Sequence, residues 1–295
     1  MPSSSTSTPT AFPTESIKPQ TQSGTGLDSE LDPNLSTLSS NISILEMGDH
    51  LYMNTPAQII DSISHDTGKL KNKKVLITGG DSGIGRAIAL IMAREGAQVS
   101  IVFLQQEISD AKQVKLQIDR ESQEFGNQSQ CLLVPLDLMS RDNCFKAVQK
   151  HVDRYGRVDV LINNSGRQDL CKKFDDIDLG TKSRRTFQLN VFGMFAITKA
   201  ALPHMSRGGS IINSTSIAAY QGSPTLVDYA STKGAIVSFS KSLALQLAPR
   251  GIRVNAVAPG IIYTALQAAT GGQEPETVEK IGVDSAPLGK TRSTL

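Results

Sequence analysis

Three polar residues between Gly209 and Ser240, namely Ser216, Tyr229 and Lys233, are of types that can carry out acid–base chemistry. Tyr229 and Lys233 are four residues apart, so on a helix their side chains lie one turn apart on the same face. A phenol can donate or accept a proton, and a nearby ammonium favours its ionised form. Either residue alone is more simply a surface side chain that extends its polar tip into water.

A glycine-rich segment, LITGGDSGIGRAIAL at Leu76–Leu90, lies between an apolar run and an amphipathic one. Gly79 would permit a tight exit from a strand, Gly83 a close approach of backbone to a pyrophosphate, and Gly85 close packing of the following helix. The spacing T-G-x-x-x-G-x-G differs from the G-x-G-x-x-G of many dinucleotide enzymes. On this segment alone, a phosphate-binding loop and a ligand-free turn both stay open.

Short apolar runs alternate with amphipathic segments from residue 71 onward, which predicts strands alternating with helices. Strands are expected at Lys74–Thr78, Gln98–Leu104, Cys131–Leu136, Val158–Asn163, Gly209–Ser214 and Ile252–Pro259. Helices are expected from the glycine-rich segment to Gly96 and at Ser109–Glu124, Asn143–Tyr155, Ser183–Met205 and Leu226–Leu247. The short connections predict an α/β, doubly wound parallel sheet of the Rossmann type with helices on both faces. Ligands bind beyond the carboxyl ends of such strands, so Ser216 would lie near the glycine-rich segment.

The N-terminal part of the chain has a different composition. Residues 1–45 contain 18 Ser and Thr and five Pro, with no apolar period, which predicts a disordered tail. Residues 46–70 are interpreted as an extension that lies on the surface, and residues 71–295 as the dinucleotide-binding catalytic domain.

The composition also argues against several functional classes. The net charge is +2 and no Lys/Arg block is dense enough to suggest nucleic acid. No apolar run approaches the ~18 residues needed to cross a bilayer, and no arginine precedes Arg86 as a mitochondrial presequence would require, so the cytoplasm is expected. Cys131, Cys144 and Cys171 show no CxxC spacing and the four histidines are scattered, so we expect reduced thiols and no metal site.

In their order along the chain, these motifs resemble those of the short-chain dehydrogenases/reductases, over roughly Leu70–Gly289. The matching motifs are TGGDSGIG at Thr78–Gly85, LDL with Asp137, NNSG at Asn163–Gly166, Asn190 in QLNVFGMF, Ser216, Tyr229, Lys233, and PGIIYT at Pro259–Thr264. The sequences that flank these motifs are most similar to those of aldehyde and ketone reductases with an extended N-terminus. The resemblance implies an NAD(P)(H)-dependent oxidoreductase that interconverts a small-molecule carbonyl and an alcohol by hydride transfer.

The resemblance implies a catalytic set of Asn190, Ser216, Tyr229 and Lys233. Tyr229 would be the general acid or base, and Ser216 would hydrogen-bond the substrate oxygen. Lys233 would lower the pKa of Tyr229 and hold the nicotinamide ribose, while Asn190 would anchor a water chain to Lys233. Lowering a tyrosine pKa from ~10 by ~3 units takes roughly 4 kcal/mol, which one ammonium at about 4 Å supplies only where water is excluded.

The resemblance also implies a set of cofactor-binding residues. They are Gly79, Asp81, Ser82, Gly83, Ile84, Gly85, Asp137, Asn163, Tyr229, Lys233, Pro259, Gly260, Ile262 and Thr264. Asp137 would meet the adenine, Asn163 would stabilise the sheet near the cofactor, and Thr264 would contact the nicotinamide amide or the phosphates. Ser165 stands where the family usually has Ala, a small change.

The end of the second predicted strand bears on the choice of dinucleotide. An acid there would bind the 2′-hydroxyl of NAD and repel the 2′-phosphate of NADP. No acid stands at the strand end, and Glu107 comes late. NADP is therefore the expected cofactor, with NAD as the alternative and Arg86 or Lys112 as candidate partners of the phosphate.

The resemblance implies a lid, a further helix and a seventh strand after Pro259. This chain has 36 residues after Pro259, and no seventh strand is predicted among them. The sixth strand would then be an open edge, and the contacts of a homo-oligomer would be weakened. Two alternatives follow: a dinucleotide-binding protein without turnover, and an inactive truncated product. The substrate pocket is expected to be shaped by Leu266–Thr270 and Arg167–Phe174. The residues in these segments do not identify the substrate.

Overall fold

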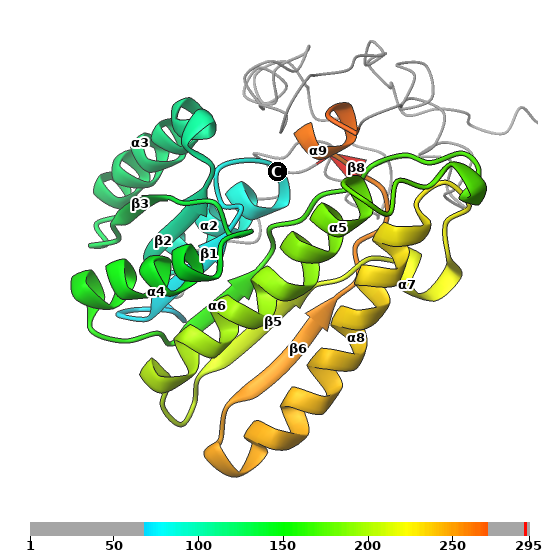
Figure 1. Ribbon diagram of the computed structural model, residues 1–295. Helices are drawn as coiled ribbons and strands as arrows, with labels where there is room; N and C mark the ends of the chain where they lie inside the picture. The colour runs from blue at the N-terminus through cyan, green and yellow to red at the C-terminus, as the bar shows by residue number, and fades with distance from the viewer. Residues whose placement is uncertain (1–67, 271–291, 294–295) are drawn as a thin grey trace, which may run out of the picture.

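The computed structural model describes residues 68–270 and 292–293. The predicted tail at 1–45 and almost all of the extension at 46–70 lie outside these residues. The described chain forms a six-stranded sheet with helices on both faces (Figure 1). Its strands are β1 Lys74–Thr78, β2 Gln98–Phe103, β3 Cys131–Pro135, β4 Val160–Asn163, β5 Ser210–Ser214 and β6 Arg253–Val257.

All neighbouring strands of this sheet are parallel, in the order β3-β2-β1-β4-β5-β6. The chain winds outward from β1 to β3, returns to β4 beside β1, and winds outward again to β6. The order therefore reverses between β1 and β4, where the carboxyl ends leave a crevice for a ligand. The predicted doubly wound α/β fold is confirmed, and each predicted strand is matched to within two residues at either end.

The helices cover the two faces of the sheet unequally. The helices α2 Gly83–Arg94 and α3 Ile108–Glu124 pack on one face, over the half of the sheet made by β1 to β3. The other face carries α4 Arg141–Tyr155, α5 Lys182–Phe187, α6 Met194–Ala201 and α8 Val227–Leu247.

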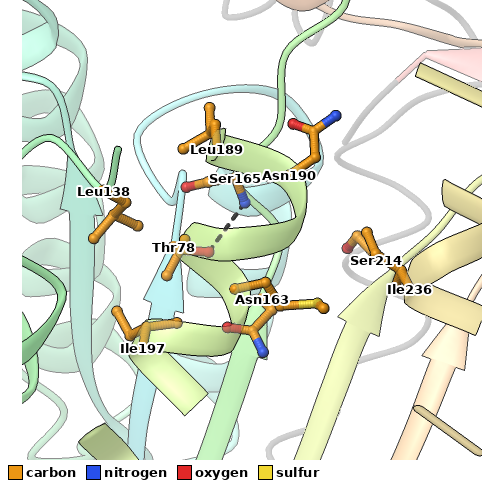
Figure 2. Close-up of a pocket in the computed structure, with 11 residues that line it drawn as sticks. Thr78, Leu138, Asn163, Ser165, Leu189, Asn190, Ile197, Ser214 and Ile236 are labelled. Atoms are coloured by element: carbon orange, nitrogen blue, oxygen red, sulfur yellow. Dashed lines mark hydrogen bonds between the residues drawn. The ribbon is translucent and has the colours of Figure 1, made fainter. Parts of the chain in front are cut away.

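The long helix predicted at Ser183–Met205 is found as a continuous helical segment that changes type along its length. Between α5 and α6 the segment Gln188–Gly193 (η4) is π-helical, and Leu202–His204 forms a 3₁₀ turn after α6. Gly193 lies so close to the preceding loop that a side-chain carbon there would come within 2.8 Å of the Leu138 carbonyl oxygen. Figure 2 shows Leu189 and Asn190 on this helical segment, next to Thr78. Single-turn π insertions of this kind occur often at functional sites.

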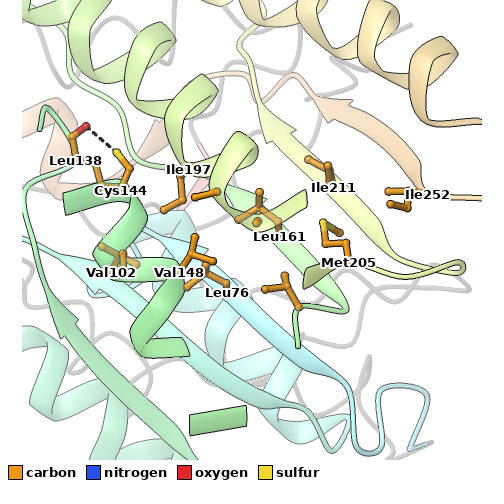
Figure 3. Close-up of a cluster of buried hydrophobic side chains, with 14 of the residues drawn as sticks. Leu76, Val102, Leu138, Cys144, Val148, Leu161, Ile197, Met205, Ile211 and Ile252 are labelled. Carbon is orange, nitrogen blue, oxygen red and sulfur yellow. Dashed lines mark hydrogen bonds between the residues drawn. The ribbon is translucent and has the colours of Figure 1, made fainter. Parts of the chain in front are cut away.

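The core consists of two clusters, one on each face of the sheet. Leu76, Leu161 and Ile211 point to the face that carries α4, α6 and α8 (Figure 3). Val75 and Ile77 point to the opposite face, against α2 and α3. Val75, Leu76 and Ile77 of β1 therefore point alternately to opposite faces of the sheet, and all three are fully buried. This explains why the sequence of this part of the strand is continuously apolar, as is typical of parallel sheets.

The described chain after β6 contributes small elements. These are β7 Ile262–Tyr263, α9 Ala265–Ala268 and β8 Arg292–Ser293, which pairs with β7 in a separate two-stranded sheet. Among the described residues β6 is the last strand of the main sheet, and residues 271–291, where no seventh strand was predicted, lie outside the description. In the described ranges, no helix combines the length and the apolar character needed to span a bilayer.

Candidate active site

The glycine-rich segment is the turn between β1 and the start of α2. Gly79 has a φ of +62°, in the left-handed region that favours glycine, and leads the chain out of the strand. A side-chain carbon at Gly85 would come within 1.7 Å of the Gly79 carbonyl oxygen, so only glycine permits this packing. The side chain of Ser82, at the N-cap of α2, makes no capping bond. The first turn of α2 therefore presents its positive end at the cleft, as an anion-binding helix does.

The neighbouring loop after β4 holds this turn in place. Asn164 Nδ2 donates to the Gly79 carbonyl oxygen at 3.0 Å, and the Thr78 hydroxyl accepts from the amides of Asn164 and Ser165 at 2.9 and 3.0 Å. The Ser214 hydroxyl donates to Asn164 Oδ1 at 3.3 Å. Sequence reasoning did not single out Thr78 or Asn164, although both stand at the carboxyl ends of adjacent strands, where ligands bind.

Ser216, Tyr229 and Lys233 meet at the carboxyl end of β5. Tyr229 and Lys233 are one turn apart on α8, and Ser216 comes two residues after the last residue of β5. Ser216 and Tyr229 line the same cleft, and the Ser216 hydroxyl accepts from the Ala218 amide at 3.2 Å. Lys233 Nζ donates to the Ser214 carbonyl oxygen at 2.8 Å and lies 5.4 Å from the centroid of the Tyr229 ring.

Burial changes the proton affinities of this pair. Burial raises the pKa of Tyr229 above its usual value, and the Ser216 hydroxyl opposes that rise. Burial lowers the pKa of Lys233 to about 8. In the protein chain by itself, the direction for Tyr229 is opposite to the lowering that the family resemblance implies. At neutral pH the phenol therefore carries its proton, and Lys233 is still largely an ammonium.

Asn190 is buried behind this cluster, in the π-helical segment. Its Oδ1 accepts from the Arg167 amide at 2.8 Å, and its Nδ2 donates to the Arg167 carbonyl oxygen and to the Thr232 hydroxyl. The side chain thus fastens the loop after β4 to α8. A side-chain carbon at Gly166 would lie 3.5 Å from both Asn190 Oδ1 and Lys233 Nζ, so the backbone of that loop lies beside both.

Two further predicted residues have structural partners. Asn163 Nδ2 donates to Thr198 Oγ1 and Asn213 Oδ1 at 3.0 and 2.8 Å, linking β4 to α6 and β5. Figure 2 shows Asn163 below Thr78 and Ser165, in a small cavity behind the cleft. Asp137 Oδ1 accepts from the Met139 amide at 2.9 Å and so shapes the loop after β3.

The loop after β2 lacks an acid free to meet a ribose. Glu107 is the last residue of a 3₁₀ turn at Gln105–Glu107, and its carboxylate accepts from the Leu104 amide at 2.8 Å. Leu104, Gln105, Gln106 and Glu107 all line the cleft, and the Glu107 side chain is largely buried. The suggestion that Arg86 or Lys112 meets a phosphate there is not supported, because within the described chain neither lines the cleft and Arg86 Nη2 donates to a residue of α3, Gln117.

One cleft of about 750 Å³ runs across the carboxyl ends of the strands. Most of the predicted site residues line it: Gly79, Asp81, Ser82, Gly83, Ile84, Asp137, Ser216, Tyr229, Lys233, Pro259, Gly260, Ile262 and Thr264. Gly85, Asn163 and Asn190 lie behind the lining and position it. The arrangement places an anion-binding helix start and an acid–base pair on one continuous surface.

Comparisons with known proteins agree with this geometry. The family model described as short chain dehydrogenase matches residues 73–275. The chain is 48% identical over 225 residues to the uncharacterized oxidoreductase YhdF of Bacillus subtilis, covering 76% of this chain and 74% of that protein. It is 44% identical over 227 residues to NADPH-dependent aldehyde reductase 1, chloroplastic, of Arabidopsis thaliana, covering 77% of each.

A solved structure is similar over the same region. It is a short chain dehydrogenase from Burkholderia cenocepacia in complex with NADP, with a TM-score of 0.67 and 27% identity over 76% of this chain and 86% of that one. The family model, the relatives and this fold agree, and the chain belongs to the short-chain dehydrogenase/reductase family of oxidoreductases.

Proposed function

We propose that the protein is an NADP(H)-dependent oxidoreductase that interconverts an aldehyde or ketone and the corresponding alcohol. The observation that carries the proposal is that Tyr229, Ser216 and Lys233 line the same cleft as the glycine-rich turn. The relative named as an NADPH-dependent aldehyde reductase supports the same chemistry.

The cleft fits a dinucleotide in both size and chemistry. Its volume of about 750 Å³ is in the usual range for small-molecule sites. Gly79 and Gly83, which have no side chains, line the cleft with backbone, and the start of α2 faces the space where phosphates would lie. Asp137 borders the far end of the cleft, beyond β3, where an adenine would be held.

When bound, NADPH would supply a hydride to the carbonyl carbon. Tyr229 gives its phenolic proton to the carbonyl oxygen, so that hydride and proton together make the alcohol. At neutral pH the phenol carries its proton and so has one to give to the carbonyl oxygen as that oxygen gains charge. Ser216 donates a hydrogen bond to the same oxygen, and the Lys233 ammonium stabilises the phenolate that is left.

The preference for NADP over NAD follows from the loop after β2. Glu107 also lines the cleft, but its side chain is buried and its carboxylate accepts from the Leu104 amide. The other lining residues of this loop, Leu104, Gln105 and Gln106, are neutral and would not repel a 2′-phosphate. The structure in complex with NADP and the NADPH-dependent relative support this choice.

We place the reaction in the cytoplasm. Cys131, Cys144 and Cys171 are free thiols, and the first two are buried. Free thiols persist in a reducing compartment.

The experiment is a fluorescence titration of the purified full chain with NADPH and with NADH, followed by NADPH oxidation in the presence of benzaldehyde or cyclohexanone. Saturable binding of NADPH, tighter than that of NADH, together with turnover of one carbonyl is the expected result. Binding without turnover of any carbonyl in a broad panel would favour a dinucleotide-binding protein. Binding of neither dinucleotide would reject the proposal.

A further inference from the structure

A buried hydrogen bond joins two segments that contribute to the cleft and lie far apart in sequence. Gln168, in the loop after β4, donates through Nε2 to the Thr270 hydroxyl at 2.8 Å and to Gln267 Oε1 at 3.4 Å. The Thr270 hydroxyl in turn donates to the Leu266 carbonyl oxygen at 2.8 Å. Gln168 and Thr270 are 6% and 3% exposed, so the bond between them is shielded from water.

The other end of the same segment rests on the glycine-rich turn. A side-chain carbon at Gly83 would lie 3.1 Å from the Thr264 methyl group, so Thr264 packs directly on the turn. Between Thr264 and Thr270 the chain forms α9, and Ala265, Leu266 and Gln267 line the cleft. Residues 264–270 therefore form a wall that is supported at one end by the turn before α2 and at the other end by Gln168.

The Gln168 end is anchored to the catalytic helix. The residue before Gln168, Arg167, has both its amide and its carbonyl oxygen bonded to the Asn190 side chain, at 2.8 and 2.9 Å. Asn190 Nδ2 also donates at 3.0 Å to the hydroxyl of Thr232, the residue before Lys233 on α8. Continuous hydrogen bonds thus connect α8, through Asn190 and the loop after β4, to α9.

We propose that Gln168 is a positioning residue whose hydrogen bond to Thr270 holds α9 as a wall of the substrate end of the cleft. The bond sets the distance between α9 and the Tyr229 side of the cleft, and so the fit of the carbonyl substrate. Its effect on α9 follows from the contacts alone, whereas its effect on catalysis rests on the proposed function.

The first measurement is hydrogen exchange of the backbone amides of Gln267, Ala269 and Thr270, which bond within α9. One buried hydrogen bond corresponds to a change of about five- to tenfold in an opening equilibrium. Gln168→Met, similar in length but unable to donate, should therefore speed exchange at these amides by about that factor. Thr270→Val should do at least the same, and Thr270→Ser, which keeps the hydroxyl, should exchange at close to the wild-type rate.

The second measurement is a comparison of KM and kcat in NADPH-dependent reduction of benzaldehyde or cyclohexanone, whichever the wild type reduces. Gln168→Met should raise KM for the carbonyl by about five- to tenfold, with a smaller change in kcat. The Gln168→Met/Thr270→Val double variant should resemble the more affected single variant, because both changes remove the same bond.

Several outcomes would overturn the inference. Unchanged exchange at α9 in Gln168→Met, or effects of the two substitutions that multiply, would show that the bond does not hold α9. If Gln168→Met does not fold, Gln168→Asn, which is one methylene too short to reach Thr270, gives the same test. A wild-type chain that binds NADPH but reduces no carbonyl would reject the proposed function, while the exchange result would still decide whether Gln168 positions α9.

Discussion

Lys233 Nζ lies 5.4 Å from the centroid of the Tyr229 ring and donates its hydrogen bond to the Ser214 carbonyl oxygen, 2.8 Å away. Burial lowers the pKa of Lys233 to about 8 and raises that of Tyr229 above 10. As pH rises, the ammonium therefore loses its proton before the phenol does. The catalytic pair has a protonated phenol beside a positively charged ammonium only below the pKa of Lys233. The lysine, and not the tyrosine, therefore sets the upper pH limit of this state.

Tyr229→Phe should abolish the proton transfer and leave the cleft intact. General acid catalysis contributes roughly a hundred- to ten-thousandfold, so kcat for carbonyl reduction should fall by about that factor. The dissociation constant of NADPH should stay within about threefold, because the ring and its packing are kept. Tyr220→Phe is the matched control, since Tyr220 is on the surface and 68% exposed. Retained turnover in Tyr229→Phe would contradict the assigned role.

The rate of carbonyl reduction should fall as pH rises through about 8. The ammonium of Lys233 is present below its pKa and is lost above it, whereas Tyr229 stays protonated over this range. A plot of log kcat/KM against pH for reduction should therefore bend downward near pH 8, with a slope approaching −1. Lys233→Arg keeps a cation at all these pH values and should remove the bend, even if its rate is lower. A wild-type profile that stays flat through this range would show that the ammonium is not required.

Stability should decrease in mild acid because of His151, which is buried far from the cleft. Its Nε2 bonds the Arg157 carbonyl oxygen at 3.0 Å and must donate, so its Nδ1 accepts from the Ser100 hydroxyl at 2.7 Å. Burial lowers the pKa of His151 from 6.5 to about 4. The unfolded chain therefore takes up a proton at higher pH than the folded chain does.

The resulting loss in the free energy of unfolding between pH 6.5 and 4 is on the order of 3 kcal/mol. Urea unfolding at a series of pH values measures it. His151→Gln, whose amide can still donate to the Arg157 carbonyl oxygen, should unfold with a weaker pH dependence than the wild type. His204→Gln is the control and should keep the wild-type dependence. Equal slopes for wild type and His151→Gln would assign the acid sensitivity to other groups.

The strands and most helices could be predicted because their patterns are local. Val75, Leu76 and Ile77 form a continuous apolar run, which a parallel strand buried on both faces requires. The helix expected at Ser183–Met205 is found as a continuous helical segment from Lys182 to His204, but residues 188–193 in its interior are π-helical. The spacing of apolar residues in a sequence does not distinguish an α-helix from a short π-helical insertion. The insertion lies at a tertiary contact, where Gly193 packs against the Leu138 carbonyl oxygen.

Site residues could be predicted where their spacing within one helix or strand brings them together, as it does for Tyr229 and Lys233 on α8. The partners of residues that act across elements were not predicted, even where the residue was named, as Asn190 was, or lay in a segment expected to shape the pocket, as Gln168 and Thr270 did. Asn164 holds the Gly79 carbonyl oxygen from 85 residues away, and Gln168 bonds Thr270 from 102 residues away. No periodicity or spacing connects such pairs, because only the folded sheet brings the loops after β4 and β6 together.

Cofactor choice should respond to a single charge at the end of β2. Leu104 is the first residue after this strand and lines the cleft, and its amide, not its side chain, bonds Glu107. Leu104→Asp would place a carboxylate where an NAD enzyme binds the ribose hydroxyl and would repel a 2′-phosphate. The dissociation constant of NADPH should rise by at least about tenfold, the effect of ~1.4 kcal/mol, while that of NADH falls or stays the same.

Leu104→Asn is the matched variant for this test, since it has nearly the same shape and no charge. It should weaken both dinucleotides by similar factors, because it introduces no charge that repels the 2′-phosphate. If Asp and Asn change the ratio of NADPH to NADH affinity equally, the discrimination does not arise at this strand end. The neutral residues Gln105 and Gln106 would then have to be tested by the same pair of substitutions.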